Sequence, residues 1–232
     1  MIYQVSDIKR DVRITLDEND SSQVLQALGD PDTLTLEQII ESKIVDAART
    51  VIATAPNTML DSGHSFAVAR ADTNTQIAWT ESGVAGHGAG HFKLPDDFLR
   101  LVTFKMHDWD YGITEAIRDT DPLYGMQYSR YGGIRGNPQR PVVAIVNHDD
   151  GLHIEFFTCT WGPYDPSDNT GTYVERAQYI KQPTIDNGKI EIPEKLRPAV
   201  IYYTAYMVML ALNDAAFAQN LLASSKELMQ TQ

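Results

Sequence analysis

The alternation of hydrophobic and polar residues predicts several helices, and the clearest lies between residues 35 and 55. Thr35 followed by Gln38 matches the capping box that begins many helices. Apolar residues then recur at helical spacing up to Ala55, with charged residues on the opposite face, and Pro56 ends the pattern. We therefore expect a helix of about five turns that packs against other helices.

Helices are also expected near both ends of the chain. Ser6 precedes an apolar stripe over residues 8–16, which predicts a short capped helix. Pro193 opens a long helix to Leu212 that is apolar on nearly all sides, and Asn213 begins a last helix through Met229. Such an apolar helix is buried on more than one face.

The middle of the chain has the signature of strands. An extended apolar segment covers 98–106, a third strand is expected at 173–180, and the stretch 141–159 predicts a hairpin through an Asp-Gly turn. Asp121 before Pro122 caps a short helix at 121–130. The order of elements predicts an α+β fold.

We expect two parts in this fold. Residues 1–56 and 193–232 form a helical bundle from N- and C-terminal helices, and residues 57–192 form an inserted β-rich region. The stretch 198–213 is apolar but shorter than the ~20 residues of a membrane span. The charged start MIYQVSDIKRDV gives no support for secretion.

Composition and the motifs that are missing exclude several classes of protein. The 232 residues carry a formal charge of −12, which disfavours a generic nucleic-acid coat. The single cysteine, Cys159, excludes an internal disulfide and a cysteine-based zinc site. No nucleophile elbow, P-loop or dinucleotide fingerprint occurs.

Two histidines stand four residues apart, at His87 and His91. Glycines at 86, 88 and 90 argue against a helix, and no glutamate lies between the histidines as a zinc-protease motif requires. A flexible loop explains this stretch better. We therefore expect no metal site, no catalytic residue and no cofactor.

Two other functions remain open as alternatives. A metal-dependent hydrolase would use His87 and His91 with Asp108 and Asp110, because paired carboxylates serve acid–base or metal chemistry. A carbohydrate- or protein-binding module would use the three tryptophans, which are Trp79, Trp109 and Trp161.

Charge is distributed unevenly along the chain. Between Asp121 and Asp149 there is no acidic residue, and three arginines, Arg130, Arg135 and Arg140, give this stretch +3. Residues 1–46 carry ten acids and four bases, a net of −6. A chain with basic and acidic parts suits head-to-tail rings, because one subunit's basic part meets the next one's acidic part.

Three sequence segments, taken in their order along the chain, resemble segments of the head-to-tail adaptors of tailed bacteriophages. The resemblance is to the tubular adaptor ring of short-tailed phages and to the ring proteins of crAss-like phages in particular. The first segment is the Ile-, Ala- and Arg-rich helix LTLEQIIESKIVDAARTVIATAP. The second is KLPDDFLRLVTFKMHDW, where Leu94, Pro95, Asp97, Phe98, Leu99 and Arg100 match the family's entry into a strand. The third is IEIPEKLRPAVIYYTAYMVM followed by a second helix.

The resemblance implies a structural virion protein without catalytic residues. Such adaptors assemble in the host cytoplasm as a ring of about twelve copies at the head–tail junction. Their partners are copies of themselves, the portal protein and a downstream tail or nozzle protein. Double-stranded DNA passes through the channel during packaging and ejection without specific binding, and no membrane is involved.

Residues for these contacts follow from charge and hydropathy. Subunit or partner contacts are expected at the three arginines above and on the last helix, at Leu221, Leu222, Leu228 and Met229. Acids facing the channel would repel phosphates. The candidates are Glu37, Glu41, Asp149 and Asp150.

Overall fold

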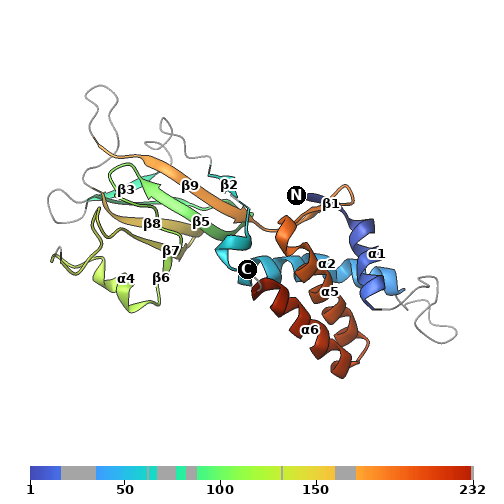
Figure 1. The fold of residues 1–232 in the computed structure, drawn as a ribbon. Coiled ribbons are helices and arrows are strands. Elements are labelled where there is room, and N and C mark those ends of the chain that lie inside the picture. The colour runs from blue at the N-terminus through green and yellow to red at the C-terminus, as the bar shows by residue number, and fades with distance from the viewer. Residues whose placement is uncertain are drawn as a thin grey trace. The chain divides into compact units, whose positions relative to one another are not determined.

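The computed structural model describes residues 1–16, 35–61, 63–66, 77–81, 88–131, 133–159 and 171–230. These residues form a mixed α and β structure with five α-helices and three sheets. They fall into two compact units, labelled by element in Figure 1. Met1–Asp61 and Gln182–Gln232 make up the helical unit, and Ser62–Lys181 make up the β unit.

The helical unit is organised around one central helix, α5. Helix α5 packs against each of the other three helices of the unit, which explains why it is apolar on nearly all sides. Two short 3-10 turns, η1 (Asn57–Met59) and η2 (Glu194–Leu196), also belong to this unit. The four helices are α1 (Val5–Thr15), α2 (Leu36–Thr54), α5 (Arg197–Ala211) and α6 (Ala215–Gln230).

The start of α2 confirms the predicted capping box. The Gln38 N–H donates to Thr35 Oγ1 at 3.4 Å, and the Thr35 N–H donates to the Gln38 side-chain oxygen at 2.8 Å. Two of the free N–H groups at this helix end are thereby satisfied. The predicted cap of α1 is wrong, because Gln4 is its N-cap and Ser6 lies inside the helix.

A small antiparallel sheet completes the helical unit. Its strands are β1 (Ile2–Gln4), β11 (Lys189–Glu191) and β10 (Ile185–Asp186), in that order. Asn187 and Gly188 join the last two with φ of 50° and 72°, as a type I′ turn requires. These strands place the junction between the units at 181/182, whereas the sequence suggested a β-rich region reaching 192.

The β unit contains two further sheets. One has the order β2-β9-β5, and the other has the order β3-β4-β8-β7-β6, in which only β6 and β7 are parallel. The bounds are β2 (His64–Ser65), β3 (Ala78–Glu81), β4 (Gly88–Lys93), β5 (Phe98–Met106), β6 (Ile117–Arg118), β7 (Val142–His148), β8 (Gly151–Cys159) and β9 (Val174–Lys181). A one-turn helix, α4 (Pro122–Met126), begins at Asp121 and ends earlier than expected.

The inner faces of these two sheets form the core of the β unit. Phe104 of β5 stacks on Phe156 of β8 at 5.8 Å between ring centroids, and it also meets Phe92 of β4 at 6.1 Å. All three side chains are buried. The predicted strand at 98–106 and the predicted hairpin at 141–159 are confirmed.

Strand β4 corrects the expectation of a flexible loop around His91. Gly88–Lys93 pairs with β3 on one side and with β8 on the other. Gly90 permits this packing, since a Cβ there would lie 2.5 Å from the Phe156 ring. The glycines therefore fit a closely packed strand.

In the part of the chain that is described, no helix is long and apolar enough to cross a bilayer.

Candidate functional site

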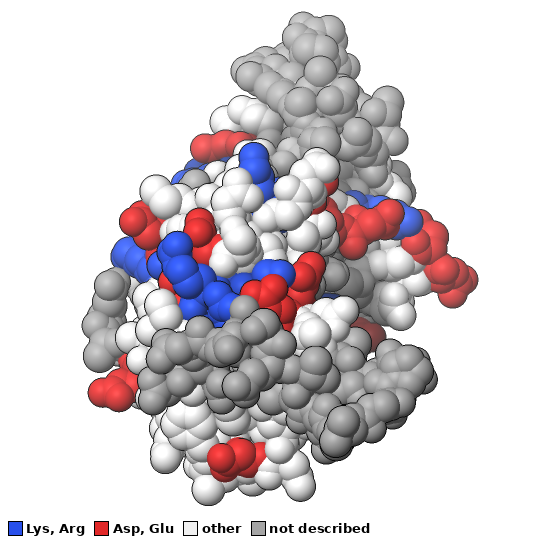
Figure 2. Space-filling view, turned by 90° about the vertical axis from the view of Figure 1, so that its right-hand side faces the viewer, with Lys and Arg blue, Asp and Glu red and all other residues white. Residues whose placement is uncertain are grey.

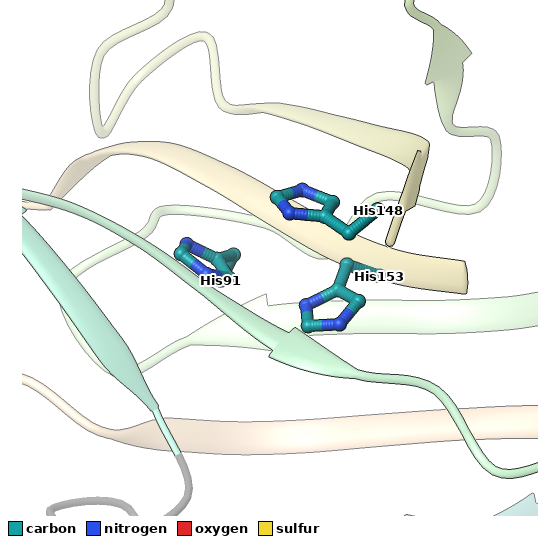
Figure 3. A group of neighbouring side chains, drawn as sticks. All are labelled: His91, His148 and His153. Carbon is teal, nitrogen blue, oxygen red and sulfur yellow. The ribbon is translucent and has the colours of Figure 1, made fainter. Parts of the chain in front are cut away.

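The outer face of the five-stranded sheet carries an unusual set of ionisable side chains. Side chains alternate between the two faces of a strand, so His153 and Glu155 of β8 lie opposite the buried Ile154 and Phe156. The register places His91 beside Glu155 and places His148 beside Gly151, on the same outer face. Figure 3 shows the three imidazoles gathered above neighbouring strands.

The three histidines lie in mutual contact. Ring centroids are 4.3 Å apart for His148 and His153, 5.0 Å for His91 and His148, and 5.3 Å for His91 and His153. One ligand atom from each ring falls within 4.8 Å of the others. Burial, followed by the charges of the two neighbouring imidazoles, lowers the pKa of His91 below its ordinary value.

A buried carboxylate organises the polar groups beside the histidines. Glu155 is only 8% exposed. Its Oε1 lies 3.0 Å from His148 Nε2, and its Oε2 accepts hydrogen bonds from the hydroxyls of Tyr124 at 2.8 Å and Tyr128 at 3.1 Å. Burial and these contacts raise the pKa of the Tyr124 hydroxyl, so it stays a donor to the carboxylate.

A second carboxylate holds His153. Asp150 Oδ1 lies 2.9 Å from His153 Nε2 across the end of the β7–β8 hairpin. Desolvation acts to raise the pKa of Asp150, but the hydrogen bond to His153, a backbone hydrogen bond and the charges of His153 and Lys93 together lower this pKa below its ordinary value. Asp149, the neighbouring candidate for a channel-facing acid, is exposed at the tip of the same hairpin.

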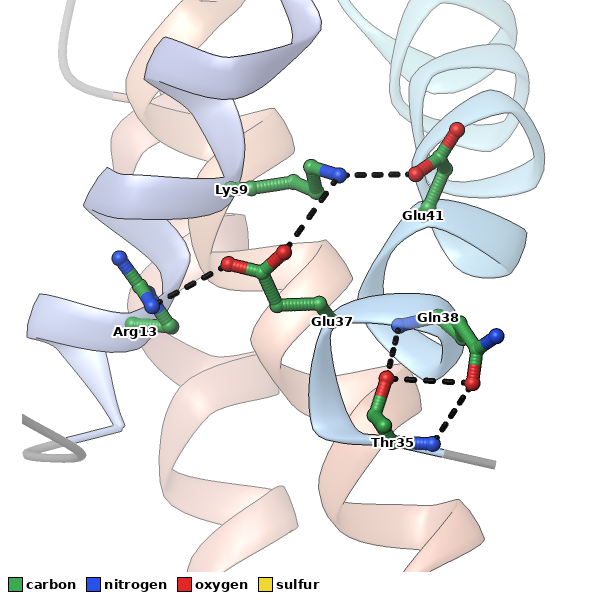
Figure 4. A network of polar contacts seen from close by, with 6 residues as sticks. All are labelled: Lys9, Arg13, Thr35, Glu37, Gln38 and Glu41. Carbon is green, nitrogen blue, oxygen red and sulfur yellow. Dashed lines mark hydrogen bonds and ion pairs between the residues drawn. The ribbon is translucent and has the colours of Figure 1, made fainter. Parts of the chain in front are cut away.

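The other two candidate channel acids are engaged in ion pairs. Figure 4 shows Lys9 bridging Glu41 at 2.8 Å and Glu37 at 3.9 Å, while Arg13 reaches Glu37 at 3.2 Å. These contacts tie α1 to α2. Two cations balance two anions, so this cluster offers no net negative charge to a channel.

Figure 2 shows the side of the molecule on which α1 lies in Figure 1. Basic and acidic side chains are interspersed over the described part of this face. Interspersed charges pair locally and produce little long-range field. The acidity of residues 1–46 is thus partly neutralised where the structure describes it.

The three arginines predicted for partner contact have different environments. Arg130 and Arg140 are exposed, whereas Arg135 is only 5% exposed, and two of its guanidinium nitrogens, Nε and Nη2, have no hydrogen-bond partner among the described residues. Arg130 lies over the ring of Tyr131, with 5.0 Å from its Cζ to the ring centroid. The structure therefore removes Arg135 from the predicted contact surface.

The apolar residues of the last helix that are predicted for subunit or partner contact also differ in their exposure. Leu221 is 5% exposed and lies with Ala218 and Ser225 on the buried face of α6, which packs against α5. The Ser225 hydroxyl donates to the Ala199 carbonyl of α5 at 2.9 Å. Leu221 therefore belongs to the core, and the half-buried candidates are Leu222, Leu228 and Met229.

The segment that consists of α4 and the residues after it exposes apolar side chains that the sequence pattern alone does not indicate. Their exposed fractions range from 43% to 63%, and Arg130 lies among them. We call this set the 123–134 surface. It consists of Leu123, Met126, Tyr128, Tyr131 and Ile134.

The described residues of the two alternative functions are not assembled into a site. The group of metal-capable side chains in the described residues contains His91 but neither Asp108 nor Asp110, and Asp108 instead accepts a hydrogen bond from Thr172 at 2.7 Å. Trp109 is buried in the core and cannot stack on a sugar. His87 and Trp161 lie outside the described residues.

The histidine group was missed because two of its members are ordinary in sequence. His148 and His153 flank a predicted hairpin turn, and a two-residue turn at Asp149 and Asp150 places them on the same face. That much was available from the sequence. Their meeting with His91 depends on the pairing of β4 with β8.

Neither a scan against protein-family models nor a search of curated proteins matched this chain.

Proposed function

We propose that this chain is a structural head-to-tail adaptor of a tailed phage. Copies of it form a ring between the portal and the tail, and DNA passes through the ring. This class of protein is proposed because three sequence segments resemble those of such adaptors and occur in the same order. In this proposal the N- and C-terminal helices act as a helical bundle and the β unit makes further contacts.

The observation that carries the proposal is the 123–134 surface. Large exposed apolar side chains within one short segment are typical of interaction sites. Tyrosine, methionine and arginine are enriched at protein interfaces, and this segment combines Tyr128, Tyr131 and Met126 with Arg130. The same segment lies in the stretch without acidic residues, which favours an acidic neighbouring subunit.

The channel-facing role is proposed for the tip of the β7–β8 hairpin. Asp149 is exposed there and Asp150 is beside it, whereas Glu37 and Glu41 are paired with cations. Repeating these two acids around a ring would give a negative constriction that repels DNA phosphates. The half-buried Leu222, Leu228 and Met229 of α6 remain candidates for contact with the portal.

Ring assembly tests the proposal directly. The full chain is mixed with portal protein and imaged by electron microscopy, and a symmetric ring is expected on the portal. Tyr131→Glu combined with Ile134→Glu should lower the fraction of portals carrying a ring at least about tenfold, which corresponds to 1.4 kcal/mol. Ile14→Glu, at an equally exposed apolar position on α1 (65%), is the matched control.

The experiment distinguishes a wrong contact surface from a wrong function. Normal rings from the double variant would exclude the 123–134 surface as the contact. Scattered single copies of the unmodified chain beside the portal would contradict the adaptor function itself.

A further inference from the structure

The histidine group on the outer face of the five-stranded sheet has the donor chemistry of a metal site. Its members come from three adjacent strands, with His91 on β4, His148 on β7 and His153 on β8. Figure 3 shows all three rings on the same side of these strands. Imidazole nitrogens are preferred ligands of zinc, copper, iron and nickel, whereas calcium and magnesium require oxygen.

Two of the three imidazoles already have the partners that metal-bound histidines use. A histidine that binds a metal through one nitrogen commonly donates the other N–H to a carboxylate, which fixes the ring orientation. Here Nε2 of His148 is held by Glu155 at 3.0 Å, and Nε2 of His153 is held by Asp150 at 2.9 Å. Both rings therefore keep Nδ1 for an ion.

An independent observation comes from the burial of His153. The side chain of His153 is only 9% exposed, and its Nδ1 is buried without a hydrogen-bond partner in the part of the chain that the structure describes. An unsatisfied buried polar atom destabilises the fold unless a partner is supplied. A bound cation would satisfy this nitrogen, and no described side chain does so.

We propose that His91, His148 and His153 bind one divalent first-row transition metal ion, with zinc as the expected occupant. Three imidazoles and a water molecule would give the tetrahedral set that zinc favours. Zn–N bonds of ~2.0–2.1 Å place ligand nitrogens about 3.4 Å apart. One nitrogen of each ring already lies within 4.8 Å of the others, so the rings would have to move closer together to bind an ion.

Charge and access also suit a cation. Asp150 and Glu155 contribute two negative charges next to the rings, and Lys93, which the register places beside His153, is exposed. The side chain of His148 is 32% exposed, so an ion can enter from solvent. A bound ion would join β4 to both strands of the β7–β8 hairpin and stiffen the hairpin tip. This proposal does not depend on the adaptor function.

The test uses the untagged full chain, freed of metal with a chelator and titrated with zinc alone against a chromophoric competitor. One equivalent should bind per chain, and the melting temperature should rise because zinc binds only the folded site. His91→Gln and His153→Ala should each weaken binding by at least about a hundredfold. Glu155→Gln should weaken it by about 10–100-fold, as expected for a lost carboxylate partner.

The control is His107→Gln, which removes an exposed histidine of the same unit that stacks on Tyr173 and is not in the group. It should bind zinc like the unmodified chain. If a histidine variant fails to fold, X-ray absorption of the zinc-loaded unmodified chain should still show three imidazole ligands.

Two results would overturn the proposal. One is an unmodified chain that binds less than one equivalent of zinc. The other is zinc binding that survives the removal of His91, His148 and His153 together, which would locate the ion elsewhere.

Discussion

The two units of this protein treat buried polar groups differently. In the described residues of the helical unit the buried polar side chains are hydroxyls, Thr204 and Ser225, and each donates to a backbone carbonyl. The β unit instead buries ionisable groups, which include Arg135, His153 and Glu155. Buried ionisable groups are costly unless they are paired, and they concentrate at functional sites. The comparison therefore directs attention to the β unit.

The charged side chains of the helical unit also differ from those of the β unit. In the helical unit, charged side chains at the surface pair between helices: Lys9 and Arg13, which are half-buried, contact Glu37 and Glu41. Ion pairs near the surface contribute little to stability. Packing of α5 against its three neighbours is thus the main source of stability in this unit.

The largest expected loss of stability comes from a substitution in the core of the β unit, and it tests whether the two units unfold independently. Phe156→Ala removes a fully buried ring that contacts Phe104 and Trp79, and it should lower the free energy of unfolding by about 3–5 kcal/mol. Hydrogen exchange should show lost protection in the β unit, with the amides of α5 still protected. Equal loss in α5 would mean that the units unfold together.

Gly90→Ala tests the close packing of β4. The added Cβ would lie 2.5 Å from the Phe156 ring and 2.9 Å from Ile77, so we expect a destabilisation of about 1–3 kcal/mol in denaturant unfolding. Gly125→Ala is the matched control, because nothing lies within 4 Å of its Cβ and alanine favours the helix α4. A neutral Gly90→Ala would show that β4 is not packed as described.

The raised pKa of the Tyr179 hydroxyl predicts that the free energy of unfolding falls at alkaline pH. Burial and the hydrogen bond from its hydroxyl to Asp97, at 2.9 Å, raise its pKa from 10.0 to about 12 in the folded chain. Because the folded pKa is the higher one, this contribution is complete below pH 10 and is lost as the pH rises through about 12.

The size of the Tyr179 effect is up to about 2 kcal/mol. It is measured as the free energy of unfolding against pH. Tyr179→Phe keeps the ring contacts with Phe66 and Phe98 but should lack this part of the alkaline loss. Identical pH profiles of the two proteins would contradict the assignment.

The smallest effect is expected for the ion pairs of the helical unit. Lys9→Ala removes the contacts with Glu37 and Glu41 and should cost about 0.2–1 kcal/mol. The loss should shrink at high salt, because screening already weakens exposed pairs. Thermal melting at low and high salt measures it, and a salt-independent loss above this range would indicate a packing role for the lysine stem.

Much of the local structure could be predicted because its causes are local. The capping box at Thr35 and Gln38, the strand at 98–106 and the hairpin at 141–159 each depend on residues near one another in sequence. The errors have local causes too. Glycines around His91 suggest a loop, whereas the close approach of Phe156 and Ile77 in the folded chain explains why the strand needs a glycine at position 90.

The candidate site could be predicted only in pieces. The segment containing Arg130 was identified from charge, but burial decided that Arg135 is inside and that Leu221 faces α5. Neither fact has a signature in the sequence, because arginine and leucine occur on both exposed and buried faces.

The order of amino acids by itself determined the helices, the main strands, the hairpin turn and the division of charge along the chain. These follow from hydrogen bonding and periodicity over a few residues. Tertiary structure alone decided that His91 meets His148 and His153, and that Glu155 is buried beneath two tyrosines. The physical reason is that strand pairing joins residues distant in sequence, and its register fixes which side chains share a face.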